Sequence, residues 1–500
     1  MPAEQANEPD SLSIDNPMPP PPEPKQTKRL IRHRHKVLLS QDVAPFAWPI
    51  AIELTCVVLM SIASTILVSR IGKADTAAVG VSDSLTFIVI SFLTAIALGG
   101  SVFIAQLYAK HDRENCIRGA AHAINLNLVF SLVAWIIVQC FAGPILSVVA
   151  YGAEAEVIRL TQMYLQTIAF SFPALAILFA GSGVLRAVGN SRLPAISNIL
   201  MNVLNILISY PLIYGLSEWG IGTWQGFGLL GAGIGITLAR WIGALMILVC
   251  LMKNRTFSVP LRAFFQPFRK NILNDILGVG IPASIESMMF NFGKLLTQVM
   301  VAGMGTVAMA GNYITFSIIL LLNIPGNTLS MASTVIIGKR LGQDRPKTAA
   351  QEMRLIFWVA TILLILLGVV SVPLAEWIAR GYTSDPEVID VVVNLLYLNA
   401  IMLPVWAASF VLPSAFKGAR DVKYTMYSAI ISMWGCRVVL GYILGIVLDL
   451  GVYGVWLGMF ADWWLRGSLY FLRMLNQRWL TKYQQRKAET IVVTSVRRTK

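Results

Sequence analysis

The sequence has few charged side chains for its length. Only 13% of its 500 residues are Asp, Glu, Lys or Arg, whereas soluble proteins carry about 25%. Hydrophobic residues make up 56% of the chain, and the mean hydropathy is +0.66. A single soluble core cannot bury that much apolar surface, because cores stop growing at about 250–300 residues. We therefore interpret the chain as a polytopic membrane protein.

Cysteine and histidine are also scarce. The five cysteines are an odd number and four of them lie in apolar runs, which argues against a disulfide framework. The four histidines have no metal-ligand spacing. The chain contains neither a G-x-x-x-x-G-K-[ST] phosphate loop nor a Gly-x-Ser-x-Gly elbow on a strand. We expect no metal, no cofactor and no enzymatic activity, and any transport must be driven by an ion gradient.

Apolar runs predict twelve transmembrane helices, because crossing the hydrocarbon takes about 20 apolar residues. The predicted spans are 44–69, 76–107, 119–141, 157–183, 193–215, 229–251, 275–302, 307–337, 355–378, 388–415, 424–447 and 452–473. Pro325, between Asn323 and Asn327, predicts a break in the eighth span.

Lys and Arg are concentrated on one side of this topology. Both tails and alternate loops hold 32 of the 40 basic residues, and the opposite loops hold four. Basic loops stay in the cytoplasm, so both termini should be cytoplasmic, in the inner membrane of a bacterium. The net charge of +14 is spread over these loops, so we expect no nucleic-acid partner.

An internal repeat divides the chain into two halves. Pro49–Glu53 matches Pro282–Glu286, and Leu185–Arg192 matches Phe416–Lys423, at an offset of 231 to 233 residues. Six spans separate equivalent positions, so the halves have parallel topology and a pseudo-two-fold axis along the membrane normal. The sequence thus predicts an all-α fold of two six-helix lobes, suited to alternating access in a transporter.

The predicted domains follow from this repeat. We expect a monomer whose partners are the bilayer and a small organic solute. The segments are a disordered Pro-rich and basic tail at 1–43, a first lobe at 44–252, a linker at 253–274, a second lobe at 275–475 and a tail at 476–500.

Eight ionisable residues lie within the predicted spans. Each costs at least about 2.5–3.5 kcal/mol to insert and is therefore a functional candidate. Asp462 and Arg466 are neighbours on one helix and favour a structural pair. Glu286 and Lys294 share a helix side but lie about 12 Å apart. The full set is Glu53, Asp83, Arg240, Glu286, Lys294, Arg437, Asp462 and Arg466.

Three acids are candidates for ion coupling. Glu53 and Glu286 occupy equivalent places in the two halves, each one turn after a helix proline. A carboxylate shielded from water takes up a proton readily, which suits a proton carrier. Asp83 is the third candidate. The alternative is that these acids form structural ion pairs facing protein.

The second half carries the surplus of positive charge within the membrane. Its intramembrane charges sum to +1, against −1 in the first half. We therefore expect it to contact an anionic substrate, with Arg437 and Lys294 as the main donors. Further candidates for the substrate cavity are Arg240, Asp462, Asn205, Trp406 and Trp434.

The repeated turn [LF]-[RK]-[AG]-x-x-[ND]-x-[RK] resembles the signature of multidrug and toxic compound extrusion (MATE) transporters. Ile324–Asn327 with Gly338–Gly342 adds to the resemblance, which covers about residues 40–480. Leu296–Gln298, Val301–Thr306 and Ser432–Val439 are similar to a subgroup that exports FMN and FAD. The resemblance implies proton- or sodium-coupled antiport of organic solutes, with flavins and peptides as cargo.

The chain departs from the family at its usual coupling acids. The first-span acid position is Ser64 here, and the positions in the seventh and tenth spans are Phe290 and Trp406. The family's ion sites therefore cannot be transferred, and coupling would fall to Glu53, Glu286 or Asp83. Neither H⁺ nor Na⁺ is favoured by the sequence.

Alternative functions remain open. A broad exporter of organic cations would suit the acidic excess of the first half. A flippase for lipid-linked precursors would need a more basic cavity and additional spans. A receptor or structural membrane protein has no need of a two-lobe repeat with charges at the bilayer midplane.

Overall fold

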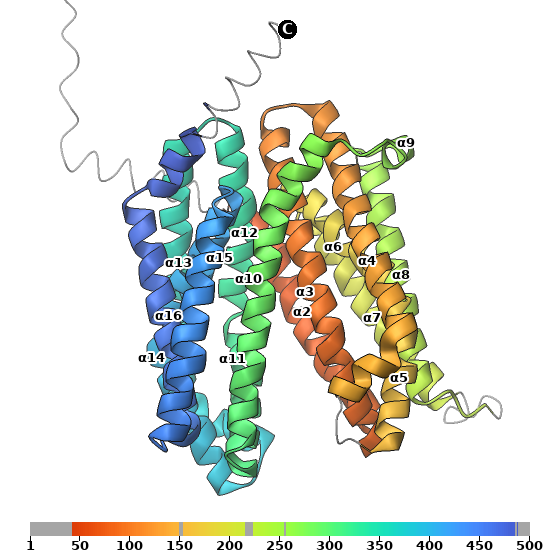
Figure 1. Cartoon of the computed structure of the whole chain (residues 1–500), viewed down its shortest axis with the longest axis vertical. Coiled ribbons are helices and arrows are strands. Elements are labelled where there is room, and N and C mark those ends of the chain that lie inside the picture. The colour runs from red at the N-terminus through yellow and green to blue at the C-terminus, as the bar shows by residue number, and fades with distance from the viewer. Residues whose placement is uncertain (1–42, 150–153, 216–223, 255–256, 486–487, 489–500) are drawn as a thin grey trace, which may run out of the picture.

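A computed structural model describes residues 43–149, 154–215, 224–254, 257–485 and 488. Almost all of the N-terminal tail lies outside these residues, so its predicted disorder is not addressed. The described part of the C-terminal tail is helical over 478–485, and Trp479 is buried there. Within the described ranges the regular structure is helical. The two halves form two bundles that stand side by side, with α3 and α10 between them (Figure 1).

The first bundle is built from seven helices. They are α2 (Ala44–Ser69), α3 (Lys73–Ala109), α4 (Arg113–Val149), α5 (Ala155–Ala169), α6 (Phe172–Ala187), α7 (Arg192–Tyr214) and α8 (Leu229–Lys253). A single turn, α9 (Leu261–Phe264), lies in the connection to the second bundle.

The second bundle begins with α10 and includes two π-helical segments, η3 and η4. Its elements are α10 (Lys270–Ala302), α11 (Thr306–Leu322), α12 (Ile324–Gly342), α13 (Pro346–Tyr382), α14 (Pro386–Gly418), α15 (Val422–Ser432), η3 (Met433–Leu440), η4 (Ile443–Val447) and α16 (Gly451–Leu475).

Each of the twelve predicted spans corresponds to one helix or to one run of consecutive helices. Eight spans are long and apolar enough by themselves, and two bent helix pairs raise the number to ten among the described residues. The remaining two are α10 and α16, of 33 and 25 residues. They are less apolar because Glu286, Lys294, Asp462 and Arg466 lie on them.

Two spans are broken by proline. α11 and α12 bend by 51° at Asn323, and Pro325 lies in the first turn of α12, as predicted. α5 and α6 bend by 47°, with Pro173 in the first turn of α6, a break that the sequence analysis did not predict. At the repeat offset of 231 residues Pro173 corresponds to Pro404. Pro404 lies inside α14, so the second half does not repeat this bend.

The eleventh span is not a regular α-helix. After α15 it continues as η3 and η4, a form that is frequent at functional sites. A Cβ on Gly458 of α16 would meet the backbone of Gly441, so this span and α16 approach backbone to backbone. The close approach brings Arg437 of η3 against Asp462 of α16.

Each half has its own hydrophobic core, and the first helix of each half begins in the core of the other. Val43 and Ala47, at the start of α2, belong to the second-half core. Ile272 and Ile276, near the start of α10, belong to the first-half core. The exchange follows the repeat, because α2 and α10 are the first spans of their halves.

The bundles touch along the second part of α3, which packs against α10 and α12. Gly99 lets the backbone of Ile276 approach closely, and the Gln106 amide donates a hydrogen bond to the Gly418 carbonyl at 3.2 Å. Val102, Val279 and Val422 form a small buried cluster. The lobes therefore meet near the end that carries the basic loops.

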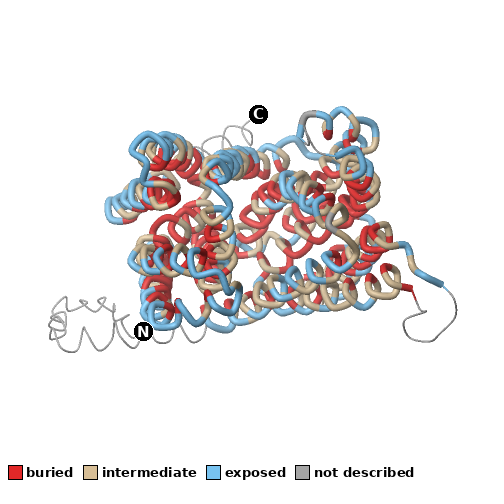
Figure 2. The backbone as a smooth tube through the Cα atoms, turned by 90° about the horizontal axis from the view of Figure 1, so that it is seen from below, coloured by how far each residue is buried: buried red, intermediate tan, exposed pale blue. Residues whose placement is uncertain are grey.

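Large apolar side chains are exposed around the perimeter, among them Trp377 and Ile401, of which 77% and 69% are exposed. Figure 2 shows buried backbone toward the inside of each bundle and exposed backbone around it. Exposed apolar perimeters of this kind are expected where lipid is the solvent.

Candidate functional site

Each lobe contains a cavity. The first-lobe cavity, of about 570 Å³, lies among α2, α3, α6, α7 and α8 and also reaches Ser330 and Thr334 of α12 and Ser414 and Lys417 of α14. The second-lobe cavity, of about 760 Å³, lies among α10, α11, α12, α14, η3 and α16. Both volumes fall within the range of small-molecule sites.

Glu53 is buried at the first-lobe cavity and fully paired. Arg186 donates to both carboxylate oxygens, at 2.6 and 2.8 Å, and the Asn198 amide donates to one of them. A carboxylate held this way cannot bind a cation unless Arg186 leaves. The geometry fits the structural alternative for Glu53 in this conformation.

Glu286 repeats this arrangement in the second lobe. Lys417 lies 2.8 Å from one carboxylate oxygen, and the Thr425 hydroxyl donates to the other at 3.1 Å. Its partner is thus Lys417 and not Lys294, which lies two turns further along α10. Arg186 and Lys417 both come from the repeated turn, so the repeat has preserved a buried ion pair in each lobe.

Asp83 differs from the two glutamates. It is exposed, and its side chain is on the side of α3 that also carries Ile90 and Thr94, two residues of the first-lobe cavity. The basic side chain whose charge acts on Asp83 is Arg240. The Arg240 guanidinium donates a hydrogen bond to the Ser171 hydroxyl at 2.8 Å. Ser171 stands at the break between α5 and α6, so Arg240 also supports the bend.

Asn205 lines the first-lobe cavity beside Ser64, the position at which the sequence resemblance leads us to expect a coupling acid. Its amide donates to the Ser64 hydroxyl at 3.3 Å, and its oxygen accepts from Ser209 at 3.1 Å. These neutral oxygens are weak cation ligands by themselves, since hard cations prefer carboxylates.

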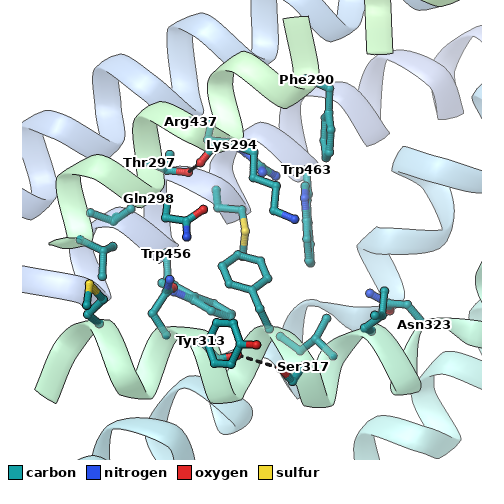
Figure 3. A pocket seen from close by; sticks show the side chains of 18 of the residues that line it. Phe290, Lys294, Thr297, Gln298, Tyr313, Ser317, Asn323, Arg437, Trp456 and Trp463 are labelled. Carbon is teal, nitrogen blue, oxygen red and sulfur yellow. Dashed lines mark hydrogen bonds between the residues drawn. The ribbon is translucent and has the colours of Figure 1, made fainter. Parts of the chain in front are cut away.

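The second-lobe cavity combines basic and aromatic side chains (Figure 3). Lys294 of α10 and Arg437 of η3 are its basic residues. Lys294 is exposed to the cavity, has no carboxylate within 4 Å among the described residues, and lies over the Phe316 ring at 5.6 Å. Aromatic lining comes from Phe290, Tyr313, Phe316, Trp406, Phe410, Trp456 and Trp463.

A buried charge cluster lies behind the cavity wall. Asp462 is fully buried, with one oxygen 3.1 Å from Arg437 and 3.6 Å from Arg466. Arg437 lies over the Phe290 ring at 5.2 Å. Arg466 lies over the Phe410 ring at 4.6 Å. The predicted pair of Asp462 with Arg466 is present, but Asp462 is shared with Arg437, which is closer.

Phe290 and Trp406, the other two positions at which the resemblance leads us to expect an acid, both line the second-lobe cavity. Trp406 is buried and stacks on Phe410, with ring centroids 4.6 Å apart. Trp434, also predicted for the substrate cavity, is exposed and lines neither of the two cavities. At these two positions, where the sequence resemblance leads us to expect carboxylates, this chain places aromatic rings near Arg437 and Arg466.

Sequence reasoning missed several residues of these sites. Arg186 and Lys417 were noticed only as part of a repeated turn, although the similar spacing of the glutamates from that turn, 133 and 131 residues, was a usable signal. Phe410 and Trp463 gave no signal, because an aromatic residue in a span is usually a packing residue.

Comparison with known proteins identifies the family. The MatE family model matches twice, over residues 49–211 and 282–443, which confirms the internal repeat. The transporter YisQ of Bacillus subtilis is 26% identical over 87% of this chain and 94% of its own length. A probable multidrug resistance protein NorM of Thermotoga maritima is 25% identical over 85% of this chain and 92% of its own.

Solved structures show the same fold. A MOP superfamily transporter from Pyrococcus furiosus, described as having a reversed binding-pocket polarity, is similar with a TM-score of 0.80, at 21% identity over 88% of this chain and 97% of its own. A MATE structure in complex with MaL6 gives a TM-score of 0.81, at 21% identity over 90% of this chain and 99% of its own. The predicted all-helical, two-lobe membrane fold is thereby confirmed. The chain belongs to the MatE family and is a multi-pass membrane transporter of the MATE type.

Proposed function

We propose that the chain is an ion-coupled antiporter that exports anionic aromatic solutes, with FMN and FAD as the first candidates and peptides as further cargo. The observation that carries this proposal is the second-lobe cavity, where Lys294 and Arg437 face a ring of aromatic side chains. Rings stack on flat solutes, and basic side chains bind phosphate or carboxylate.

The size of the cavity agrees with this cargo. About 760 Å³ is within the 300–1,000 Å³ that drug-sized ligands occupy. Polar side chains such as Gln298, Asn312 and Asn323 also line it and can hydrogen-bond the edge of a heterocycle.

Coupling would use H⁺ or Na⁺ at Asp83 in preference to the two glutamates. Glu53 and Glu286 already accept hydrogen bonds from basic partners. Asp83 is exposed and accepts no hydrogen bond from the described residues. We place the protein in a bacterial inner membrane with both termini in the cytoplasm, because both tails and the loops on their side hold 32 of the 40 basic residues.

Export of flavins by intact cells tests the proposal. We expect cells that express the protein to accumulate more FMN and FAD in the medium than cells with an empty vector. Asp83→Asn should lower the export at equal membrane expression. Arg159→Gln, which alters an exposed pair with Glu156, serves as the control. No rise in external flavin at good expression would refute flavin export.

A second candidate, export of organic cations, is favoured by the same Asp83. An acid on the helix side that leads to the first-lobe cavity, with no hydrogen-bond partner among the described residues, can attract a cationic drug as well as a coupling ion. Cells would then release a cationic dye such as ethidium faster than control cells, and Arg437→Gln would leave that release unchanged.

A further inference from the structure

We propose that the second-lobe cavity holds a site for the phosphate dianion of a planar aromatic phosphomonoester, and that Asp462 is the internal counter-ion which this phosphate replaces at Arg437. The inference rests on the proposed function and narrows its substrate class. Free orthophosphate shares the head-group chemistry, but it lacks the ring that the cavity walls would stack.

The local charges are unbalanced. Within the described part of the lobe, Arg437 and Arg466 both pair with one acid, Asp462, and Lys294 lines the same cavity as Arg437. The charges of these four side chains sum to +2. A phosphate monoester carries about −1.5 to −2 at neutral pH, so it matches this charge better than a carboxylate or a neutral ring does.

Unpartnered hydrogen-bonding atoms lie at the same place. The Trp463 indole N–H, in a side chain that is 4% exposed and lines the cavity, has no acceptor among the residues that the structure describes. Nε and Nη2 of Arg466 also have no acceptor within hydrogen-bond distance, and Oδ1 of Asp462 has no donor. Buried donors without partners are rare, and an anion entering the cavity could supply the missing acceptor of Trp463, which lines it.

Aromatic rings fix the orientation of the two arginines. Arg466 lies over Phe410 at 4.6 Å and over Phe290 at 5.8 Å, which keeps its guanidinium behind the wall. Arg437 lines the cavity itself. We therefore assign direct contact with the phosphate to Arg437 and Lys294, and assign to Arg466 the task of holding Asp462 when Arg437 turns toward the ligand.

Arg437 can switch between the bound phosphate and Asp462, and this switch provides a way to release the cargo. With the cavity empty, Arg437 donates to Asp462 through Nε at 3.2 Å. A bound phosphate competes for the same donors. Asp462 then remains paired with Arg466, at 3.6 Å on the same helix, and can recover Arg437 when the cargo leaves.

Binding of FMN against riboflavin tests the site, because the two ligands share one ring system and differ in the phosphate. The full chain in lipid nanodiscs should bind FMN about 10- to 100-fold more tightly than riboflavin, as expected for charge-assisted hydrogen bonds. Arg437→Gln should abolish this preference and leave the Kd for riboflavin unchanged. This substitution leaves Asp462 paired with Arg466, so we expect the variant to fold.

Two further variants act as controls. Arg380→Gln makes the same chemical change in an exposed pair of the same lobe and should leave both Kd values unchanged. Arg437→Lys keeps the charge and should retain part of the phosphate preference if its elution profile is monodisperse. An equal Kd for FMN and riboflavin in the unmodified protein, or a phosphate preference that survives Arg437→Gln, overturns the site.

Asp462→Asn tests whether Asp462 is a counter-ion that competes with the phosphate for Arg437 or only supports the structure. Without the competing carboxylate, FMN should bind more tightly while the maximal export rate falls, so KM and kcat decrease together. A rise in KM with kcat unchanged would contradict the counter-ion role.

Failure of the site and failure of the proposed cargo are distinguishable. If neither flavin binds, flavin export is refuted, and 4-methylumbelliferyl phosphate against 4-methylumbelliferone replaces the ligand pair. A phosphate preference there that depends on Arg437 supports the site. Its absence overturns the site whatever the cargo is.

Discussion

The buried pair of Glu53 and Arg186 shows how one residue choice constrains a membrane lobe. Glu53 is 5% exposed, and both of its oxygens accept hydrogen bonds from Arg186. Removing one partner of such a pair leaves an uncompensated charge in a poorly hydrated site. The pair joins α2 to the end of α6, so it also fixes where the first helix stands.

Glu53→Gln should destabilise the protein strongly, by about 3–5 kcal/mol, because Arg186 is left without its counter-ion. The measurement is the Tm of purified protein in detergent. Glu53→Gln combined with Arg186→Gln should recover much of the loss, because no charge is then buried alone. Glu376→Gln, in the exposed pair with Arg380, should hardly change the Tm. A Glu53→Gln Tm equal to that of the unmodified protein would contradict a structural pair.

At the scale of the element, the eleventh span determines where Arg437 stands. Its π-helical segment η3 and the glycine contact with α16 place Arg437 against Asp462. A regular α-helix over the same residues would turn Arg437 to another face, because each π turn holds about one more residue. The charge cluster therefore depends on backbone form as well as on side-chain identity.

Gly458→Ala should disturb this element, because its Cβ would meet the Gly441 backbone. We expect a loss of about 1–3 kcal/mol, as for other overpacked contacts, together with a weaker preference for FMN over riboflavin. Thermal unfolding and ligand titration measure the two effects.

Gly435→Ala, on the same π-helical segment with nothing within 4 Å of its new Cβ, is the matched control. If both variants behaved alike, the close approach would not be what positions Arg437.

The helices were predictable from the sequence because length and apolar content decide what can cross a bilayer. Pro325 also marked its break correctly. The bend before Pro173 was missed, since proline in a span is tolerated either inside a helix or at its start. The π-helical form of η3 leaves no sequence signal, and the pairing of Glu53 with Arg186 depends on a fold that periodicity does not specify.

At the scale of the whole molecule, the lobes contact each other near the basic loops, through Val102, Val279 and Val422 and through the Gln106 amide. Alternating access requires these contacts to separate at some point in the cycle.

Val102→Cys combined with Val279→Cys should therefore trap the lobes in this arrangement when oxidised. We expect the cross-linked protein to lose export, and a reductant to restore it. The single variants under the same oxidant control for the five natural cysteines. Normal export by a fully cross-linked sample would mean that the lobes transport without parting at this end.

The exchanged starts of α2 and α10 affect how the protein is made. Val43 and Ala47 leave the ribosome more than two hundred residues before the helices whose core they complete. During insertion the first turn of α2 must wait in lipid until the second half has been synthesised. Ile272 and Ile276, by contrast, meet a first half that has already been inserted. We therefore expect the packing of the first helix against the second-half core to be a late step of biogenesis.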